Sequence, residues 1–300
     1  MNKVSVGQSD LQLSRLVYGV WRLADASDVS HAHVREKVDA CLDQGITTFD
    51  HADIYGDYEC EKLFGQVLAT DPSLRTRMEI ISKCDIALMS DKFSDRRVKY
   101  YDTSAQYIQK SVEQSLKNLH TDYLDLFLIH RPDPFMDAAE TAKALDSLID
   151  SGKVRAIGVS NFSVWDWRLL QSQMKHRLVV NQVEMSLLQR DEFTNGNLSA
   201  MQIDGMTPMA WSPLAGGALF AQSPETARLA PIFARMADMQ NCTPDQIALA
   251  WLLAHPANII PVVGTNNIDR IKALEQVSSI NIDRETWFEL WTAAAGQEVA

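Results

Sequence analysis

The sequence predicts a (β/α)8 TIM barrel, and three observations favour this α/β fold class. Short apolar runs alternate with helical patterns along most of the chain, and eight such runs can be counted from Leu16 onward. The runs are apolar throughout, as expected for parallel strands that are buried on both faces. Three of the runs lead into ionisable side chains, Asp50, Lys83 and His130, and a barrel keeps its catalytic groups at the carboxyl ends of its strands.

The chain begins with two short strand-like runs, Lys3–Val6 and Leu11–Ser14, and the turn residues between them predict an N-terminal β-hairpin. Leu16–Val20 is then the first expected barrel strand, and Gly19 gives its backbone freedom to pass close to a ligand. The other expected strands are Ile46–Phe49, Met78–Lys83, Leu124–His130, Val154–Val159, Leu178–Val183, Pro208–Trp211 and Ile259–Val263.

A helical pattern follows each expected strand, with apolar residues three or four positions apart. The first helix begins at Ser30 and stops before Gly45, a residue type that often ends helices. The others begin near Tyr58, Ser104 and Ser163 or span Asp137–Ser151, Leu198–Ile203, Arg228–Met239, Pro244–Ala254 and Asn267–Val277. Arg284–Ala294 is expected to be an extra C-terminal helix. No linker rich in Pro, Gly or Ser divides the chain, so we expect one domain over residues 1–300.

Loops at the barrel mouth should select the substrate, because the scaffold itself is shared by many activities. The expected mouth segments are Trp21–Val29, Asp85–Thr103, Leu187–Asn197 and Gly296–Ala300. Five aromatic residues are candidates for an apolar lining there: Trp21, Phe93, Tyr100, Tyr101 and Phe135.

A doubly wound open sheet is the competing α/β architecture. A nucleotide bound to such a sheet normally meets a Gly-x-Gly-x-x-Gly motif after an early strand. The sequence contains no such motif, so we favour the barrel.

The overall charge excludes some classes of partner. A net charge of −11 argues against nucleic acid or an anionic membrane, because either would need a broad basic face. The first residues lack the apolar core of a signal peptide, and no apolar run reaches the roughly 18 residues of a spanning helix. We therefore expect a cytoplasmic protein. Its four cysteines are widely spaced and form no Cys-x-x-Cys pair, which indicates reduced thiols.

Four ionisable residues at strand ends suggest one chemistry. A tyrosine such as Tyr55 is a poor acid at neutral pH, but a nearby ammonium such as that of Lys83 stabilises the phenolate. A carboxylate such as Asp50 would hold the lysine charged, and His130 could donate a hydrogen bond to a substrate oxygen. This set suits the protonation of an oxygen that is becoming an alkoxide.

The sequence also resembles a known family, the aldo-keto reductase superfamily, and the resemblance covers essentially the whole chain. It is carried by blocks in the family's order: Gly45–Asp50 with Ala52 and Tyr55-Gly56, Ser82-Lys83, Leu124-Asp125-Leu126 through His130, Gly152–Arg155, Gly158–Phe162, Asn181–Glu184, Trp211–Leu214, and Gly264-Thr265 through Arg270-Ile271. The residues next to these blocks, His51, Asp53 and Cys84, make the sequence most similar to a bacterial subgroup of oxidoreductases.

The resemblance implies an enzyme that reduces aldehydes or ketones to alcohols with a nicotinamide dinucleotide. It assigns proton donation to Tyr55, tuning of that tyrosine to Lys83, support of the lysine to Asp50, and substrate orientation to His130. It implies further that Ser160, Asn161 and Gln182 hold the nicotinamide carboxamide and that Trp211 stacks on the ring. The full set of implied cofactor contacts is Gly19, Val20, Trp21, Asp50, Ser160, Asn161, Gln182, Trp211, Ser212, Pro213, Leu214, Gly216, Gly264, Thr265, Asn266 and Arg270.

The expected cofactor is NADPH/NADP+ rather than the form without the 2′-phosphate. Arg270 matches the arginine that contacts this phosphate in many family members, and Gly264 and Thr265 precede a helix start that could add backbone donors. Two departures weaken the match. Gly264 stands where many members have a lysine, and Leu274 stands where many have an adenine-binding asparagine.

Two other functions stay open at the level of sequence. A metal-dependent hydrolase on the same barrel could use His51 and Asp53 with His130, and His31-Ala32-His33 has the His-x-His spacing of some metal sites. That reading leaves Tyr55 and Lys83 without a role, so we expect no metal. The superfamily also resembles the β subunits of potassium channels, which makes a cofactor-binding regulatory subunit the other alternative.

Overall fold

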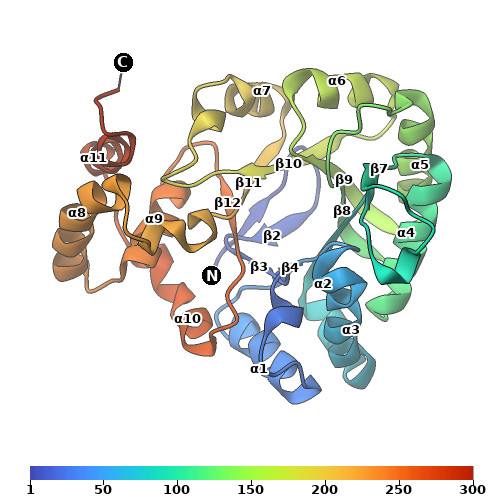
Figure 1. Ribbon diagram of the computed structural model, residues 1–300, viewed down its shortest axis with the longest axis horizontal. Helices are drawn as coiled ribbons and strands as arrows, with labels where there is room; N and C mark the ends of the chain where they lie inside the picture. Colours follow the sequence, from blue (N-terminus) through green and yellow to red (C-terminus); the bar gives the residue numbers. More distant parts are fainter. Residues whose placement is uncertain (300) are drawn as a thin grey trace.

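The computed structural model describes residues 1–299, so that Ala300, the last residue of the expected domain and of the mouth segment Gly296–Ala300, lies outside the described residues. Eight parallel strands form one closed barrel in the order β10, β11, β12, β3, β4, β5, β8 and β9. Figure 1 shows these strands at the centre of the molecule with helices around them. The predicted β/α barrel is confirmed.

Each barrel strand overlaps one of the eight predicted runs. The strands are β3 (Val17–Gly19), β4 (Thr48–Asp50), β5 (Glu79–Cys84), β8 (Leu124–Ile129), β9 (Val154–Ser160), β10 (Leu178–Glu184), β11 (Thr207–Trp211) and β12 (Ile260–Val263). One face of each strand packs against helices and the other fills the barrel, which explains why these runs are apolar at successive positions.

The predicted hairpin covers the end of the barrel at which the strands begin. Its strands, β1 (Lys3–Ser5) and β2 (Gln12–Ser14), pair antiparallel. Val6 and Leu13 are fully buried and belong to the cluster of side chains inside the barrel. The Gly7 amide donates to Thr207 Oγ1 at 2.8 Å, where β11 begins. The opposite end, where the strands finish, is therefore the open mouth.

Helices follow the strands as the periodicity predicts, several of them starting after a capping side chain such as Ser30, Ser104 or Asp137. They are α1 (His31–Leu42), α2 (Tyr55–Tyr58), α3 (Cys60–Thr70), α4 (Ala105–Asn118), α5 (Ala138–Asp150), α6 (Val164–Gln173), α7 (Asn197–Asp204), α8 (Pro224–Gln240), α9 (Pro244–Leu253), α10 (Ile268–Lys272) and α11 (Arg284–Ala295). Within residues 1–299, none of them has the length and apolar character needed to cross a bilayer.

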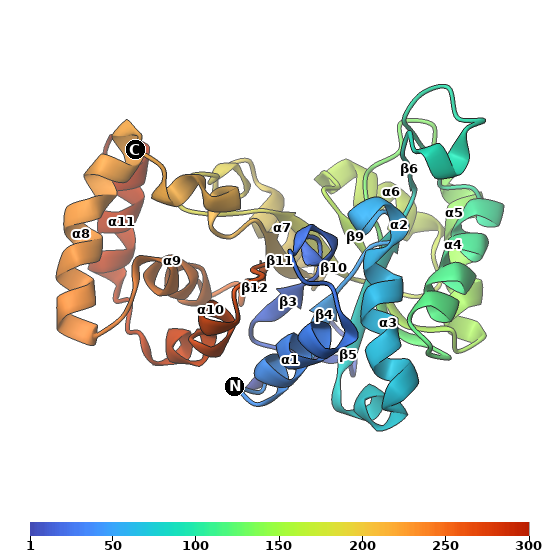
Figure 2. The same ribbon diagram turned by 60° about the horizontal axis from the view of Figure 1, so that its bottom comes forward.

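The predicted C-terminal helix α11 packs beside α8 at one side of the molecule, outside the ring of helices (Figures 1 and 2). Arg235 on α8 donates to Glu289 on α11 at 2.8 Å. Trp287 and Trp291 share one face of α11, with ring centroids 5.4 Å apart, and Trp287 stacks on Trp251 of α9 at 4.8 Å. These contacts fix the end of the chain to the barrel.

One predicted helix, Asn267–Val277, is wrong in extent. The structure has the short helix α10 followed by a 3₁₀ segment, η6 (Leu274–Ser279). Two glutamine side chains from other elements take the backbone groups that a continuous helix would use. Gln246 Nε2 donates to Ala273 O at 2.7 Å, and the Glu275 amide donates to Gln44 Oε1 at 2.8 Å.

The long connection Asp85–Thr103 has structure of its own. It contains β6 (Ile86–Ala87) paired antiparallel with β7 (Tyr100–Tyr101), and a 3₁₀ turn, η3 (Asp91–Phe93). In Figure 2 the β6 segment extends away from the body of the barrel. The remaining 3₁₀ segments are η1 (Leu23–Asp25), η2 (Pro72–Arg77), η4 (Asp191–Phe193) and η5 (Ala215–Phe220).

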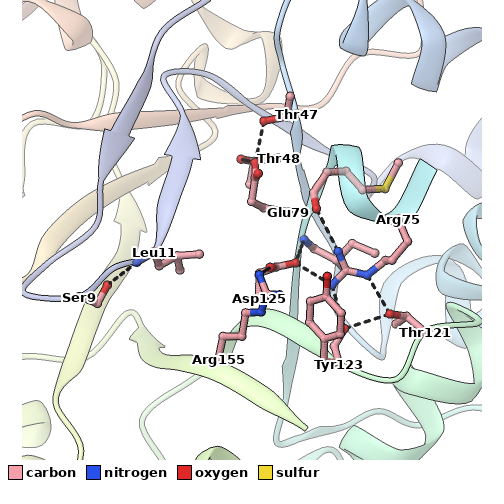
Figure 3. A network of polar contacts seen from close by, with 12 residues as sticks. Ser9, Leu11, Thr47, Thr48, Arg75, Glu79, Thr121, Tyr123, Asp125 and Arg155 are labelled. Carbon is pink, nitrogen blue, oxygen red and sulfur yellow. Dashed lines mark hydrogen bonds and ion pairs between the residues drawn. The ribbon is translucent and has the colours of Figure 1, made fainter. Parts of the chain in front are cut away.

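A network of polar contacts joins the beginnings of β5, β8 and β9 (Figure 3). Asp125 accepts a hydrogen bond from Arg75 Nη2 at 2.7 Å and another from Arg155 Nη1 at 3.0 Å. Arg75 also lies over the Tyr123 ring, 3.9 Å from its centroid. Asp125, one of the residues that carry the family resemblance, therefore stabilises the end of the barrel away from the mouth.

Candidate active site

The alternation of side chains along a strand brings the predicted residues into one layer at the barrel mouth. Ile81 and Leu128 point into the barrel, so Lys83 on β5 and His130 after β8, each two positions further, point inward where the strands end. Asp50, Ser160, Gln182 and Trp211 reach the same layer at the ends of β4, β9, β10 and β11. The inner core therefore changes from apolar to polar within one step of the pleat.

Tyr55 is held in place by the turn that follows β4. The Asp53 amide donates to Lys83 O at 3.0 Å, and the Tyr55 amide donates to Ala52 O at 3.2 Å. Gly56 then reverses the chain with φ of 59°. A Cβ on Gly56 would lie 2.6 Å from the Ala24 Cβ, so both the conformation and the space favour glycine next to Tyr55.

Three of the four predicted catalytic residues form a chain of contacts. Lys83 is fully buried, and its Nζ donates to Asp50 Oδ2 at 2.7 Å, to His51 O at 2.8 Å and to Tyr55 Oη at 3.1 Å. The ammonium therefore lies between a carboxylate and a phenol. Its charge is neutralised on one side and directed at the phenol on the other.

His130 stands beside Tyr55, with ring centroids 5.9 Å apart in an edge-to-face arrangement. It lines the cavity at the mouth, and its Nδ1 is enclosed without a hydrogen-bond partner among residues 1–299. Nε2 is then the nitrogen available to a bound molecule.

Burial and charge shift the pKa values of these groups in different directions. Burial raises the pKa of Tyr55, and the Lys83 charge opposes this rise without cancelling it. Burial disfavours the ammonium of Lys83, but the charges of Asp50 and Tyr55 outweigh it, and the pKa of Lys83 is raised. Burial and then the Lys83 charge hold the pKa of His130 well below its usual value. At neutral pH the site contains a neutral phenol, a charged lysine and a neutral imidazole.

A second set of contacts connects the predicted carboxamide-binding residues. Ser160 Oγ donates to Gln182 O at 2.7 Å and accepts from Asn161 Nδ2 at 2.8 Å. Trp211 Nε1 donates to Asn161 Oδ1 at 2.9 Å, and Gln182 Nε2 donates to Asp50 Oδ1 at 2.9 Å. Asn161 has φ of 61°, a left-handed conformation that asparagine tolerates.

A cavity of about 830 Å³ opens in front of these residues. Of the predicted site residues, it is lined by Gly19, Trp21, Asp50, Tyr55, His130, Ser160, Asn161, Gln182, Trp211, Ser212, Pro213, Leu214, Gly216, Gly264, Thr265, Asn266 and Arg270. Two predicted residues do not line it. Lys83 lies behind Tyr55 and Asp50, and the Val20 side chain is 1% exposed and packs in the core between strands and helices.

Three loops meet over one end of the cavity. Arg22, which follows β3, donates from Nη2 to Gly216 O at 3.2 Å in the loop after β11. Asn266, which follows β12, donates from Nδ2 to Arg22 O at 2.5 Å. Gly216 and Gly217 have φ of 65° and 103°, and a Cβ on either would meet no described atom within 4 Å. Arg22 lies in the predicted mouth segment Trp21–Val29, although it was not among the predicted site residues.

The structure also brings in lining residues that the sequence analysis missed. Arg131 directly follows His130, so the strand-end argument could have identified it. Lys99 and Ile86 also line the cavity and lie in the predicted mouth segment Asp85–Thr103, whereas Leu249 on α9 carries no comparable signal. Of the five aromatic candidates, Trp21 and Tyr101 line the cavity, whereas Phe93, Tyr100 and Phe135 do not.

The histidine and aspartate pairs weighed as metal ligands do not converge. The His51 ring is buried edge-on against Phe64, with centroids 4.5 Å apart, and Asp53 accepts from Ser111 Oγ at 2.8 Å. His31, at the start of α1, contacts Thr70 Oγ1 at 2.8 Å. In the part of the chain that the structure describes, no group of three or more His, Cys, Asp or Glu side chains is placed to hold a metal ion.

Known proteins share both this sequence and this fold. The sequence model of the Aldo/keto reductase family matches residues 15–293. A 6-dehydroglucose reductase of Agrobacterium fabrum (strain C58) is 53% identical over 290 residues, which cover 97% of each chain. The uncharacterized oxidoreductase YcsN of Bacillus subtilis (strain 168) is 42% identical over 301 residues, which cover 100% of each chain.

A solved structure agrees with these relatives. The crystal structure of the thermostable aldo-keto reductase Tm1743 with the inhibitor epalrestat matches with a TM-score of 0.81 and 27% identity, covering 98% of this chain and 100% of the other. These matches extend over nearly the whole chain and show that the protein belongs to the aldo/keto reductase family of oxidoreductases, which generally use a nicotinamide cofactor.

Proposed function

We propose that the protein reduces an aldehyde or ketone to an alcohol, with NADPH as the reductant and Tyr55 as the proton donor. The observation that carries this proposal is the buried chain of contacts from Asp50 through Lys83 to Tyr55, which ends at the cavity. When bound, NADPH supplies the hydride that reaches the carbonyl carbon. The residues of the chain have to bind the cofactor and the substrate, orient the carbonyl group and protonate its oxygen.

Tyr55 and Lys83 would provide the proton. Because burial raises the pKa of Tyr55, the phenol is fully protonated at neutral pH and is ready to donate. An alkoxide is a much stronger base than a phenolate, so the proton moves to it from Tyr55 Oη. The Lys83 ammonium, 3.1 Å from that oxygen, then stabilises the phenolate that is left.

His130 would orient the carbonyl. Its low pKa keeps the imidazole neutral, so that Nε2–H can donate one hydrogen bond without adding a second positive charge beside Lys83. A carbonyl oxygen held between Tyr55 and His130 has its carbon facing the centre of the cavity. Orientation of this kind accounts for a large part of many enzymatic rate enhancements.

The residues present fit the nicotinamide end of a dinucleotide. Trp211 offers a flat ring at the cavity, and its indole nitrogen is already bonded to Asn161, which fixes the ring orientation. Gln182 gives one amide hydrogen to Asp50, and no described group donates to its Oε1, which can accept from a carboxamide. The open space at Gly216 and Gly217 would let the Gly216 amide approach a pyrophosphate, whereas the Gly217 amide already donates to Leu214 O at 3.0 Å.

The preference for the 2′-phosphate would come from the loop after β12. Arg270 lines the cavity there. At position 264, where many members have a lysine, this chain has a glycine. A lysine from another element lies nearby, because Nζ of the buried Lys37 on α1 donates to Asn266 Oδ1 at 3.0 Å. This contact and the hydrogen bond from Asn266 Nδ2 to Arg22 O would fix the loop after β12 at the end of the cavity where the phosphate is expected.

The test is the exchange of Tyr55 for Phe, which removes only the hydroxyl. We expect turnover to fall by at least about 100-fold, as is typical for the loss of a general acid, while the NADPH dissociation constant changes little. Tyr123→Phe is the matched control, because that phenol lies at the opposite end of the barrel beside Arg75. Lys83→Met should act through the same step, so the double variant should lose little more than the worse single one. Retained turnover in Tyr55→Phe would refute the assignment.

The first carbonyl compounds to assay are sugar aldehydes, since the relative from Agrobacterium fabrum is named a 6-dehydroglucose reductase. A panel of aldehydes and ketones, followed by the loss of NADPH absorbance, would identify the preferred class. The same panel separates the other candidates. A regulatory subunit would bind NADPH without turnover that depends on Tyr55, and a metal-dependent hydrolase would lose activity with a chelator and ignore the cofactor.

A further inference from the structure

Two cations line the cavity on the side away from the expected cofactor phosphates. Arg131 follows β8, and Lys99 lies just before β7 in the connection after β5. In the barrel order, β5 and β8 stand across from β11, β12 and β3, the strands whose loops carry Gly216, Arg270 and Arg22. The two cations therefore follow strands that lie across the barrel from the loops of the expected phosphate site, and the Arg131 side chain extends over the mouth as far as the Trp211 ring.

Neither cation is neutralised by the protein. Among residues 1–299, the Arg131 guanidinium and the Lys99 ammonium make no hydrogen bond and no ion pair within 4.0 Å. The guanidinium lies 5.7 Å from the Trp211 ring centroid, and the ammonium lies 5.9 Å from that of Tyr101. Lys83, by contrast, is paired with Asp50 at 2.7 Å.

The acidic groups nearby do not change this balance. Burial raises the pKa of Glu184, at the end of β10, and the Arg131 charge opposes this rise without cancelling it, but the two side chains form no ion pair. The other acidic residues that line the cavity besides Asp50 are Asp25 and Asp245, which lie on η1 and α9, on the side of the expected cofactor. The charges of Arg131 and Lys99 act on the catalytic imidazole as well, since both help to lower the pKa of His130 after burial and Lys83.

The main-chain position of Arg131 is fixed. Its backbone amide donates to Asp85 Oδ2 at 3.1 Å, and the Asp85 side chain is buried. The guanidinium is therefore presented from a rigid turn next to His130, where it can reach a group a few bonds from the reacting carbonyl. A guanidinium with free donors matches the planar geometry of carboxylates and related anions.

We propose that the natural substrate is an aldehyde or ketone that carries an anionic group, a carboxylate, phosphate or sulfonate, and that Arg131 binds this group with added charge from Lys99. The proposal rests on the reductase function proposed above. It makes Arg131 a specificity-determining residue of a protein whose net charge is −11 and which would otherwise repel such substrates.

The test compares two aldehydes of the same shape, 4-carboxybenzaldehyde and its neutral amide analogue 4-formylbenzamide. We expect the full-length wild-type protein with NADPH to prefer the carboxylate by about tenfold in kcat/KM. Arg131→Gln should lower kcat/KM for the carboxylate by about 10- to 100-fold, the range for a charged hydrogen bond, and change that for the amide by less than about threefold. Arg131→Lys should retain part of the preference, and Lys99→Met should reduce it by a smaller factor than Arg131→Gln.

The control is Arg177→Gln, which removes the same charge at an exposed position directly before β10, at the other end of the barrel. It should leave both aldehydes unaffected. Added salt should raise KM for the carboxylate and not for the amide, because only the former interaction is between charges. Equal kcat/KM for the two aldehydes, or equal loss for both in Arg131→Gln, would overturn the anionic substrate alone. Absence of turnover with both aldehydes and with the whole carbonyl panel described above would overturn the reductase function and this proposal with it.

Discussion

The exchange of Asp50 for Asn removes one charge and one hydrogen-bond acceptor from the interior of the barrel and hardly changes the shape of the side chain. The side chain of Asp50 is 3% exposed and that of Lys83 is 0% exposed. Asparagine has nearly the same shape as aspartate, and its Oδ1 can still accept the hydrogen bond from Gln182 Nε2, now 2.9 Å away. Its NH2 group then replaces the oxygen that accepts from Lys83, so one hydrogen-bond acceptor is lost as well. What is lost is the anion 2.7 Å from the Lys83 ammonium.

The expected loss of stability follows from this stranded ammonium. Removing one partner of a buried ion pair typically costs about 3–5 kcal/mol. Lys83 keeps two oxygen acceptors, His51 O at 2.8 Å and Tyr55 Oη at 3.1 Å, so we expect the lower end, about 3 kcal/mol. The double variant Asp50→Asn/Lys83→Met removes the stranded charge and should regain at least about 2 kcal/mol relative to the single variant, since apolar replacement of a buried pair is often close to neutral.

The pH dependence should differ in sign between the two proteins. In the wild type the pKa of Lys83 is raised above its usual 10.5, so its contribution to stability is fully present below pH 10.5 and is lost as the pH rises through the folded-state value. In Asp50→Asn, burial acts without the opposing carboxylate and lowers the pKa of Lys83. The unfolded chain then binds more protons than the folded one, and stability increases as the pH rises toward 10.5.

Urea denaturation at pH 7.0 and pH 9.5, followed by tryptophan fluorescence and circular dichroism, measures both effects. The conservative Asp125→Asn exchange is a useful comparison, because that carboxylate is also buried but pairs with the partly accessible Arg75 and Arg155. A free energy of unfolding for Asp50→Asn within about 1 kcal/mol of the wild type would contradict the reasoning, as would a double variant no more stable than the single one.

Two further predictions concern the cofactor and the turn that holds Tyr55. Arg270→Ala should weaken NADPH binding by about 1.5–3 kcal/mol, the range for a charged hydrogen bond, and leave NADH binding nearly unchanged; dissociation constants from tryptophan quenching measure this, and equal losses would make Arg270 structural. Gly56→Ala should reduce both stability and turnover, because the added Cβ would lie 2.6 Å from Ala24 Cβ and 2.7 Å from Cys60 Sγ. The loss of stability should exceed the roughly 1–3 kcal/mol that a strained left-handed residue costs. Gly152→Ala, at φ of 75° with no described atom within 4 Å, isolates the conformational part, and equal thermal shifts in both variants would contradict the role of the clash.

The barrel could be predicted from the sequence because two features identify its strands. Each is a short run that is apolar on both faces, and several end in a polar residue two positions after a buried one. The step from Ile81 to Lys83 and the step from Leu128 to His130 follow from the pleat of a strand and require no knowledge of the tertiary structure. The convergence of Lys83 with Asp50 and Tyr55 then follows from the parallel order of the strands.

The features that could not be predicted depend on contacts between segments distant in sequence. The helix after β12 ends early because Gln44 and Gln246 bond to its backbone, and neither glutamine is marked by any local pattern. Phe93 looks like a mouth residue in the sequence, yet it packs between Tyr58 and Arg96. Lys99 lies in a segment that was predicted to be at the mouth, but the pairing of β6 with β7, just after Lys99, has no strand periodicity that would predict it.

The distribution of charge in the barrel links stability to function. In the polar layer the cation of Lys83 is matched by Asp50, so the reacting centre has no net charge before a substrate binds. Arg131 and Lys99 line the cavity at one side of the mouth, and Arg22 and Arg270 line it at the other side together with Asp25 and Asp245. The side of Arg131 and Lys99 has no acidic residue among those that line the cavity, so that side can attract an anion although the net charge of the protein is −11. This arrangement would draw in both a phosphate-bearing cofactor and an anionic carbonyl compound, and it explains why the ion pair below them has to be closed: an unpaired Asp50 would repel both.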